Sequence, residues 1–143
     1  MSAGAPQLLV NVDVPDLARA ERFYTAALGL TVGRRFGDAG VELLGAAAPI
    51  YLLTTPAGSS PFSGAAEKRR FDRHWTPVHL DFAVADLEVA LARAEAAGAR
   101  RELPVQQHAW GRLAVLSDPF GHGFCLLQFE GAGYDAIATA SSR

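Results

Sequence analysis

Two stretches of the chain share one layout and together decide the fold. Residues 8–30 read LLVNVDVPDLARAERFYTAALGL, and residues 76–99 read TPVHLDFAVADLEVALARAEAAGA. In each stretch an apolar strand pattern is followed by an aspartate, an amphipathic helix pattern and a glycine. Asp16 of the first stretch reappears 70 positions later as Asp86. The sequence therefore predicts an internal duplication.

The first copy predicts a βαβββ unit over residues 8–55. Apolar alternation predicts a strand at 8–14, and Asp16 fits the N-cap of the helix that follows. Gly29 fits the end of that helix because glycine adopts a positive φ without strain. The buried stripe of this helix is predicted at Leu17, Ala20, Tyr24 and Ala27 or Leu28. Three further strands are predicted at residues 30–36, 41–45 and 50–55.

The second copy predicts the same order of elements over residues 77–130. A strand at 78–84 leads to Asp86 as the N-cap of a helix at 87–97, whose stripe contains Leu87, Ala90 or Leu91, and Ala94. Gly98 takes the part of Gly29. Strands follow at 101–107, 112–117 and 124–129. The prediction is an α+β fold in which two βαβββ repeats form a curved mixed sheet with the helices outside.

The rest of the chain is predicted to connect and flank these two units within one domain, 1–143. Residues 56–76 are rich in Gly, Ser and Pro and then become basic, which is typical of a linker or flap. Residues 131–143 form a tail.

Composition excludes several classes of partner. The 143 residues are 50% hydrophobic and 20% charged, enough to fill a hydrophobic core. A formal net charge of -2 gives no electrostatic reason to expect nucleic acid or an anionic membrane as a partner. No stretch resembles a signal peptide or a membrane span, and the lone Cys125 cannot form an intrachain disulfide. We therefore expect a cytoplasmic protein whose partner is a small molecule.

The strand at 78–84 carries two polar side chains on one face. Alternation places Val78, Leu80, Phe82 and Val84 toward the helix, so His79 and Asp81 point to the opposite, concave side. By the same reasoning the first strand directs Leu9, Asn11 and Asp13 to its own concave side. One face of each strand is thus predicted to serve the core and the other a site.

The sequence resembles the vicinal oxygen chelate superfamily, which includes glyoxalase I, bleomycin-resistance proteins and extradiol dioxygenases. Within it, the chain is similar to the glyoxalase-like domains common in actinobacterial genomes. The resemblance covers residues 8–130 and rests on VDVPDLARAERFYTAALGL, on HLDFAVADLEVALARAEAAGA and on DPFGHGFCLL. It implies that each βαβββ unit curls into a half-barrel. It also implies that two units, usually together with a second chain, enclose a concave ligand site, so we expect a homodimer.

The resemblance also implies four metal-ligand positions, at the first and last strand of each unit. Carried over to this chain they fall on Leu9, about Leu52, His79 and Cys125. Two of the four are leucines, and a divalent cation needs three or more nitrogen, oxygen or sulfur donors. We therefore expect no metal cofactor, although Asp81 or Asn11 could replace a missing ligand.

The candidate ligand-binding residues are Asn11, His79, Asp81, Trp110 and Cys125. His79 and Asp81 are predicted to act on the ligand, as a general base or as a hydrogen-bonding pair, and the alternative is a structural hydrogen bond at the seam between the two halves. The resemblance places Trp110 where bleomycin-resistance-like proteins line their pocket; a packing role is the alternative. Cys125 is interpreted as a small buried apolar residue with no nucleophilic role.

Three functions fit these residues. The first is a metal-independent protein that binds a small organic compound and either sequesters or transforms it. The second is a metal-dependent lyase or isomerase of the glyoxalase type, in which a cation orients two vicinal oxygens. The third is a homodimeric interaction module without a ligand.

Overall fold

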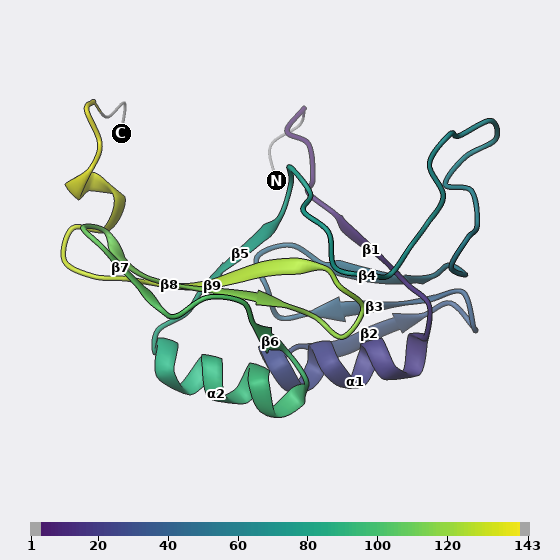
Figure 1. The fold of residues 1–143 in the computed structure, drawn as a ribbon, viewed down its shortest axis with the longest axis horizontal. Coiled ribbons are helices and arrows are strands. Elements are labelled where there is room, and N and C mark those ends of the chain that lie inside the picture. Colours follow the sequence, from purple (N-terminus) through teal and green to yellow (C-terminus); the bar gives the residue numbers. More distant parts are fainter. Residues whose placement is uncertain (1–3, 141–143) are drawn as a thin grey trace. The chain divides into compact units, whose positions relative to one another are not determined.

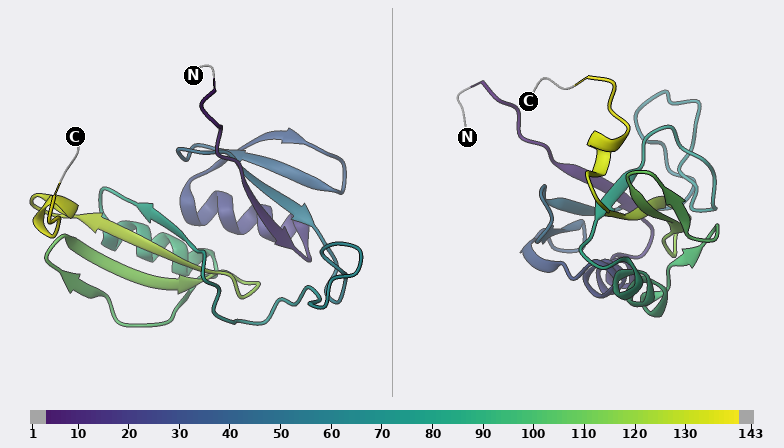
Figure 2. Two further views of the ribbon diagram at one scale, coloured as in Figure 1. Left: turned by 90° about the horizontal axis from the view of Figure 1, so that it is seen from above. Right: turned by 90° about the vertical axis from the view of Figure 1, so that its left-hand side faces the viewer.

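The computed structural model describes residues 4–140, which divide into two compact units at Phe71 and Asp72. Each unit contains one sheet with one helix packed on it, as Figure 1 and Figure 2 show. The chain is therefore α+β with two βαβββ units, as predicted. The strands form two sheets, one in each unit.

The first unit contains β1 (Val10–Val14), α1 (Leu17–Leu28), β2 (Thr31–Arg35), β3 (Gly40–Leu44) and β4 (Ile50–Thr54). Its strand order is β1-β4-β3-β2, with β1 parallel to β4 and the other pairs antiparallel. The predicted cap is confirmed, because the Arg19 backbone N–H donates to Asp16 at 3.0 Å. Gly29 ends the helix with φ 68°, as the sequence predicts.

Helix α1 packs on β3 and β4, and its buried face differs slightly from the prediction. Ala20, Tyr24 and Ala27 are buried as expected, but Leu17 is only half-buried. Phe23, which the predicted stripe omits, is buried instead and meets Tyr24 edge-on. The large ring fills volume that the smaller stripe residues leave open.

The second unit contains β5 (Leu80–Ala83), α2 (Leu87–Ala97), β6 (Arg100–Arg101), β7 (Gln106–His108), β8 (Gly111–Ser117) and β9 (Gly123–Phe129). The sheet order is β5-β9-β8-β6, and β7 also pairs with β8. A short 3₁₀ helix, η1 (Gly133–Ala136), follows β9. The cap at Asp86 and the left-handed Gly98 again agree with the prediction.

Three predicted strands differ from the structure by more than one residue at an end or are divided. The strand expected at 101–107 is divided into β6 and β7, because Pro104 lies between them and has no N–H to donate to a sheet. The first strand begins at Val10, which leaves Leu9 before it. The strand expected at 78–84 begins at Leu80, so Val78 lies outside it and is 80% exposed, contrary to its predicted place facing the helix.

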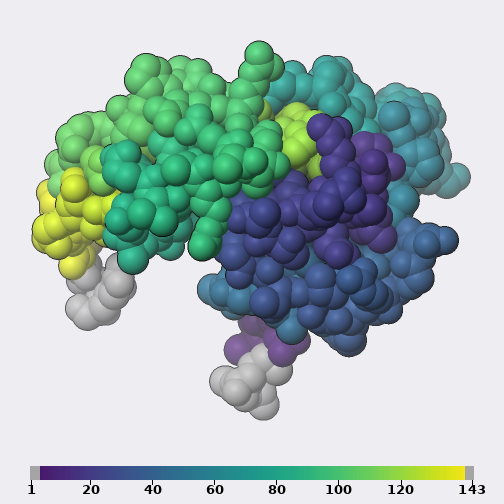
Figure 3. All heavy atoms as spheres, turned by 90° about the horizontal axis from the view of Figure 1, so that it is seen from below, coloured from purple at the N-terminus to yellow at the C-terminus, as the bar shows by residue number. Residues whose placement is uncertain are grey.

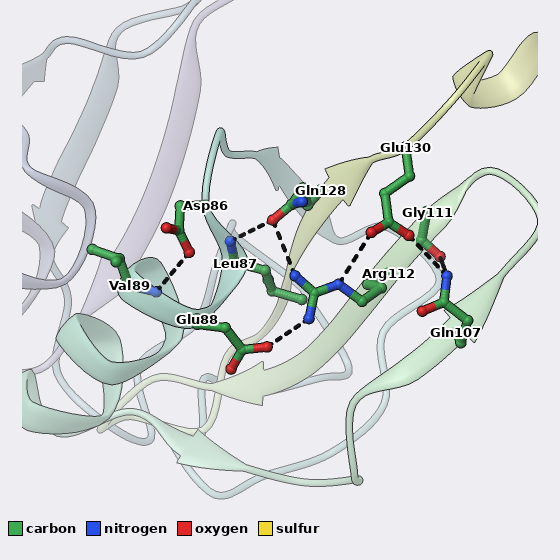
Figure 4. Close-up of polar contacts among 9 residues, drawn as sticks. All are labelled: Asp86, Leu87, Glu88, Val89, Gln107, Gly111, Arg112, Gln128 and Glu130. Carbon is green, nitrogen blue, oxygen red and sulfur yellow. Dashed lines mark hydrogen bonds and ion pairs between the residues drawn. The ribbon is translucent and has the colours of Figure 1, made fainter.

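Polar contacts at the start of α2 fix which strand residues face the helix (Figure 4). The Leu87 backbone N–H donates to the Gln128 side chain at 2.8 Å, and the Arg112 guanidinium donates to both Glu88 and Gln128. Gln128 and Arg112 are cross-strand neighbours in β9 and β8. Because successive strand residues alternate, their neighbours Leu127 and Leu113 face away from α2.

The predicted linker is shared between the two units. The Arg69 guanidinium donates to Asp13 at 2.8 Å, which ties residues 56–71 to the first unit. Arg73 belongs to the second unit and forms a two-pronged ion pair with Glu102, at 2.5 and 2.9 Å. None of the helices within residues 4–140 is long and apolar enough to cross a membrane.

Candidate functional site

The face of the second sheet that points away from α2 forms the floor of a cavity of about 310 Å³. Strand β9 lies in its centre, with β5 on one side and β8 on the other. The pairing register aligns Asp81, Cys125 and Val115 in one row across the three strands. The next row on the same face contains Leu127 and Leu113. A polar row is thus followed along β9 by an apolar one.

All the residues that line the cavity come from the second unit. Besides the two rows of the floor, they come from the segment before β5, from the start of β9, from the residue before β8 and from η1. The lining beyond the floor consists of Arg73, Trp75, Thr76, His79, Trp110, Gly123, Phe124 and Tyr134. Most of this lining is apolar or aromatic, which is typical of sites for small organic molecules.

His79 and Asp81 form a close pair at the edge of the cavity. His79 Nδ1 lies 2.9 Å from Asp81 Oδ1, and the side chains are 48% and 39% exposed. When the proton is on Nδ1, it faces the carboxylate, and the Nε2 lone pair remains available to accept a proton. The exposure of both side chains fits a pair that borders a cavity.

Cys125 lies at the floor of the cavity beside Asp81 and is buried. Burial, followed by the charge of Asp81 and a hydrogen bond to it, raises the pKa of the Cys125 thiol to about 11. The group is therefore a neutral thiol near pH 7 that donates weakly to Asp81. This agrees with its interpretation as a residue without a nucleophilic role.

His79, Asp81 and Cys125 offer three metal-ligand atoms that all lie within 4.8 Å of one another, the one such group found in residues 4–140. Their chemistry suits a borderline ion such as zinc. However, His79 Nδ1 and Asp81 Oδ1 already contact each other at 2.9 Å, and the raised pKa of Cys125 keeps its thiol protonated near pH 7. The donors fit a metal only after His79 and Asp81 separate and Cys125 loses its proton.

The structure corrects the assignment of Leu52 to a metal-ligand position. Leu52 is 0% exposed and belongs to the hydrophobic core. The register pairs Asn11 with Tyr51 and pairs Asp81 with Cys125, so Tyr51 is the counterpart of Cys125 in the first unit. The assignment failed because a one-residue shift along a strand moves every side chain to the other face.

The face that carries Tyr51 in the first unit is occupied by an ion-pair cluster. Its cross-strand row contains Asn11, Tyr51 and Glu42. Glu42 is 6% exposed and accepts hydrogen bonds from the Arg34 backbone and guanidinium and from the Tyr51 hydroxyl. These donors, with the Arg34 side chain first, lower the pKa of Glu42 to about 2. We call Arg34, Glu42 and Tyr51 the Glu42 cluster.

Of the five residues predicted to bind ligand, the structure gathers four in one cavity. His79, Asp81, Trp110 and Cys125 all line it. Asn11 lies in the first unit, and its part in ligand binding stays a prediction. The Trp110 ring is stacked on His108 at 5.0 Å, a contact that fixes the ring at the cavity wall.

Sequence reasoning missed Arg73, Trp75 and Tyr134 as lining residues. Arg73 and Trp75 lie in the predicted linker, and Tyr134 lies in the predicted tail. One signal was available for Arg73. Glycines at 121 and 123 leave room for it, since a Cβ on Gly123 would come within 2.7 Å of the guanidinium. Nothing in the local pattern identifies Tyr134.

Comparison with known proteins agrees with this architecture. The chain is 37% identical over 119 residues to a protein of Mycobacterium tuberculosis and Mycobacterium bovis named "Putative glyoxylase CFP32"; the match covers 81% of the chain and 40% of the relative. A glyoxalase/bleomycin resistance protein from Albidiferax ferrireducens is 26% identical, with a TM-score of 0.63 over 85% of this chain and 97% of that one.

A more distant structure shares the fold alone. The fosfomycin resistance protein FosX from Listeria monocytogenes is 19% identical, with a TM-score of 0.65 over 91% of this chain and 96% of its own.

Residues 9–127 match the family described as glyoxalase-like domain. With its two βαβββ units, the chain belongs to the glyoxalase-like domain family, within the glyoxalase, bleomycin resistance and vicinal oxygen chelate superfamily.

Proposed function

We propose that the chain binds a small organic molecule in the cavity of its second unit and needs no metal to do so. The observation that carries this proposal is the arrangement of the floor, where the polar row at Asp81 and Cys125 adjoins the apolar row at Leu127 and Leu113. Such a floor orients a ligand with a polar group at one end and apolar surface at the other.

The His79–Asp81 pair supplies the polar contacts in this proposal. Asp81 accepts a hydrogen bond from the ligand with its second oxygen, and His79 Nε2 accepts a proton from an acidic O–H or C–H group. With an unreactive ligand the same contacts lead to sequestration. With an acidic ligand they transfer a proton to His79, whose charge Asp81 then stabilises.

Substitution of the pair tests this proposal. Native mass spectrometry of the purified chain is the way to identify a co-purifying compound. The affinity of this compound is then to be measured for His79→Ala and Asp81→Asn. We expect each variant to lose about tenfold in affinity, which corresponds to about 1.4 kcal/mol for a hydrogen bond to a charged group. Both melting temperatures should stay near the wild-type value.

His122→Ala provides the matched control, because His122 lies in the turn before β9 and does not line the cavity. It should bind the compound as the wild type does. A large fall in the melting temperature of His79→Ala with unchanged affinity would instead assign the pair to the structural role at the seam.

A metal-dependent lyase or isomerase is the second candidate, favoured by the convergence of His79, Asp81 and Cys125. A bound metal would polarise two neighbouring oxygens of a substrate. Titration with Co²⁺ tests it, because a thiolate ligand produces a charge-transfer absorption that Cys125→Ser abolishes. We expect no such band and less than one equivalent of metal in the purified chain.

We also infer a homodimer and a cytoplasmic location. Strands β1 and β5 are edge strands of their sheets, and open edges are usually paired or covered. Sedimentation at micromolar concentration should give a dimer, and a monomer there would contradict this inference. The lone, buried Cys125 supports a reducing compartment.

A further inference from the structure

We propose that Tyr134 closes the aromatic end of the cavity and determines how long a ligand the cavity accepts. The ligand class that follows is an elongated compound with a hydrogen-bonding group at one end and a planar apolar body. This inference rests on the proposed function, since it assigns the second end of the same cavity. It goes beyond that function by naming a specificity residue outside the matched family segment 9–127.

The cavity floor has two chemically different ends along β9. The polar end is at Cys125, beside Asp81. The other end is at Trp110, which directly precedes Gly111, the cross-strand neighbour of Phe129. Four residue steps of extended strand lead from Cys125 to Phe129, a span of about 13 Å. A ligand whose polar group contacts Asp81 therefore extends over Leu127 toward the aromatic end.

Three aromatic rings meet at that end. The Tyr134 centroid lies 4.7 Å from Phe129, edge-on, and 5.4 Å from Trp110. Tyr134 and Trp110 both line the cavity, whereas Phe129 does not. Tyr134 is 46% exposed and also lines the cavity. It thus forms a terminal wall against which the body of a ligand would lie.

The segment that carries Tyr134 is attached to the rest of the unit at few points. Its backbone hydrogen bonds within residues 131–140 are local, from Gly133 to Glu130, from Asp135 to Ala132 and from Ile137 to Tyr134. No residue of η1 is buried. Figure 1 shows this segment in yellow after the end of β9, and Figure 3 shows its atoms in yellow on the surface.

Tyr134 can therefore be substituted without changing the strands that form the cavity floor. From η1, Tyr134 contacts the rings of Trp110 and Phe129, while the floor is formed by β5, β8 and β9. A change at Tyr134 therefore alters the length of the cavity without altering its polar end. The competing explanation is that Tyr134 only covers Trp110 and has no effect on which ligand fits.

Two neutral fluorescent amines of different length distinguish these explanations. 2-Naphthylamine is the short probe and 2-aminoanthracene the long one, and each carries at one end the N–H donor for Asp81. Their dissociation constants are measured with the full chain as wild type, Tyr134→Ala and Tyr134→Phe. Ile137→Ala is the matched control, because Ile137 is exposed on the same segment and does not line the cavity.

We expect Tyr134→Ala to change the ratio of the two dissociation constants about three- to tenfold in favour of the long probe, the range of one aromatic contact. Tyr134→Phe and Ile137→Ala should keep the wild-type ratio. Circular dichroism checks that each variant is folded, and Tyr134→Leu repeats the measurement if Tyr134→Ala is not.

Each further result has a defined meaning. If the wild type binds both probes and Tyr134→Ala leaves their ratio unchanged, this inference is wrong and the proposed function stands. If neither probe binds the wild type, the proposed function and this inference both fail. Asp81→Asn should weaken both probes by a similar factor, because it acts at the polar end.

Discussion

The two units of this chain share their scaffold but differ at one cross-strand row. In the second unit the row of Asp81, Cys125 and Val115 leaves open space above it. In the first unit the corresponding row contains Asn11, Tyr51 and Glu42, and Arg34 covers it with hydrogen bonds. Short side chains thus leave a cavity in the second unit, where the longer polar side chains of the first unit fill the corresponding place.

The difference shows how one fold can serve two purposes. In both units an aspartate caps the helix and a left-handed glycine ends it. The interior of a strand pair, by contrast, tolerates any side chain that packs or finds its hydrogen bonds. The Glu42 carboxylate is buried within its sheet, whereas the His79–Asp81 pair is partly exposed, as the proposed function requires.

The largest effect on stability is expected from a substitution at Leu52, beside the Glu42 cluster. Leu52→Ala should lower the free energy of unfolding by about 2–5 kcal/mol, because it creates a cavity in the core of the first unit. Chemical denaturation measures the effect. Leu53→Ala, at a half-buried neighbouring position, should cost clearly less. Equal losses would contradict the assignment of Leu52 to the core.

Next in size is a contrast in stability between the two rows. Glu42→Gln removes the charge that three donors share, and we expect a melting temperature several degrees below wild type. Asp81→Asn should change it little, since exposed ion pairs contribute at most about 1 kcal/mol. Thermal melts of both variants test this, and a reversed order would assign the structural role to Asp81.

Acid should reduce the difference in stability between the wild type and Glu42→Gln. The pKa of Glu42 falls from an ordinary 4.5 to about 2 in the folded chain, chiefly through hydrogen bonds from Arg34. A lowered folded pKa contributes stability above pH 4.5, and this contribution is lost as the pH falls toward 2. The wild type should therefore approach Glu42→Gln in stability over this window. A gap that stays constant on acidification would show that the carboxylate charge is unimportant.

The smallest expected effect is on the thiol of Cys125. Burial is the main cause of its raised pKa and the charge of Asp81 comes second. Asp81→Asn should therefore increase the rate of alkylation by iodoacetamide at pH 8 only a few-fold. Mass spectrometry of the folded chain follows the reaction. A fast wild-type reaction would mean that the thiol is ionised, in conflict with its surroundings.

Local signals predicted much of the second site. Alternation in VHLDFAV placed His79 and Asp81 on one face, and the structure brings both to the cavity. The order of strands, the two caps and the helix ends also followed from residue patterns, because these features depend on neighbours in the chain. Register between strands was less accessible, as the difference between Leu52 and Tyr51 shows.

The sequence by itself determined the duplicated α+β scaffold and the faces of its short strands, since periodicity and capping act over a few residues. Only the tertiary structure decided that Arg34 covers Glu42 and that Tyr134 reaches Trp110. Tyr134 and Trp110 are 24 positions apart in the sequence and meet through the pairing of β8 with β9. Such contacts depend on chain reversal and side-chain packing, which no local pattern records.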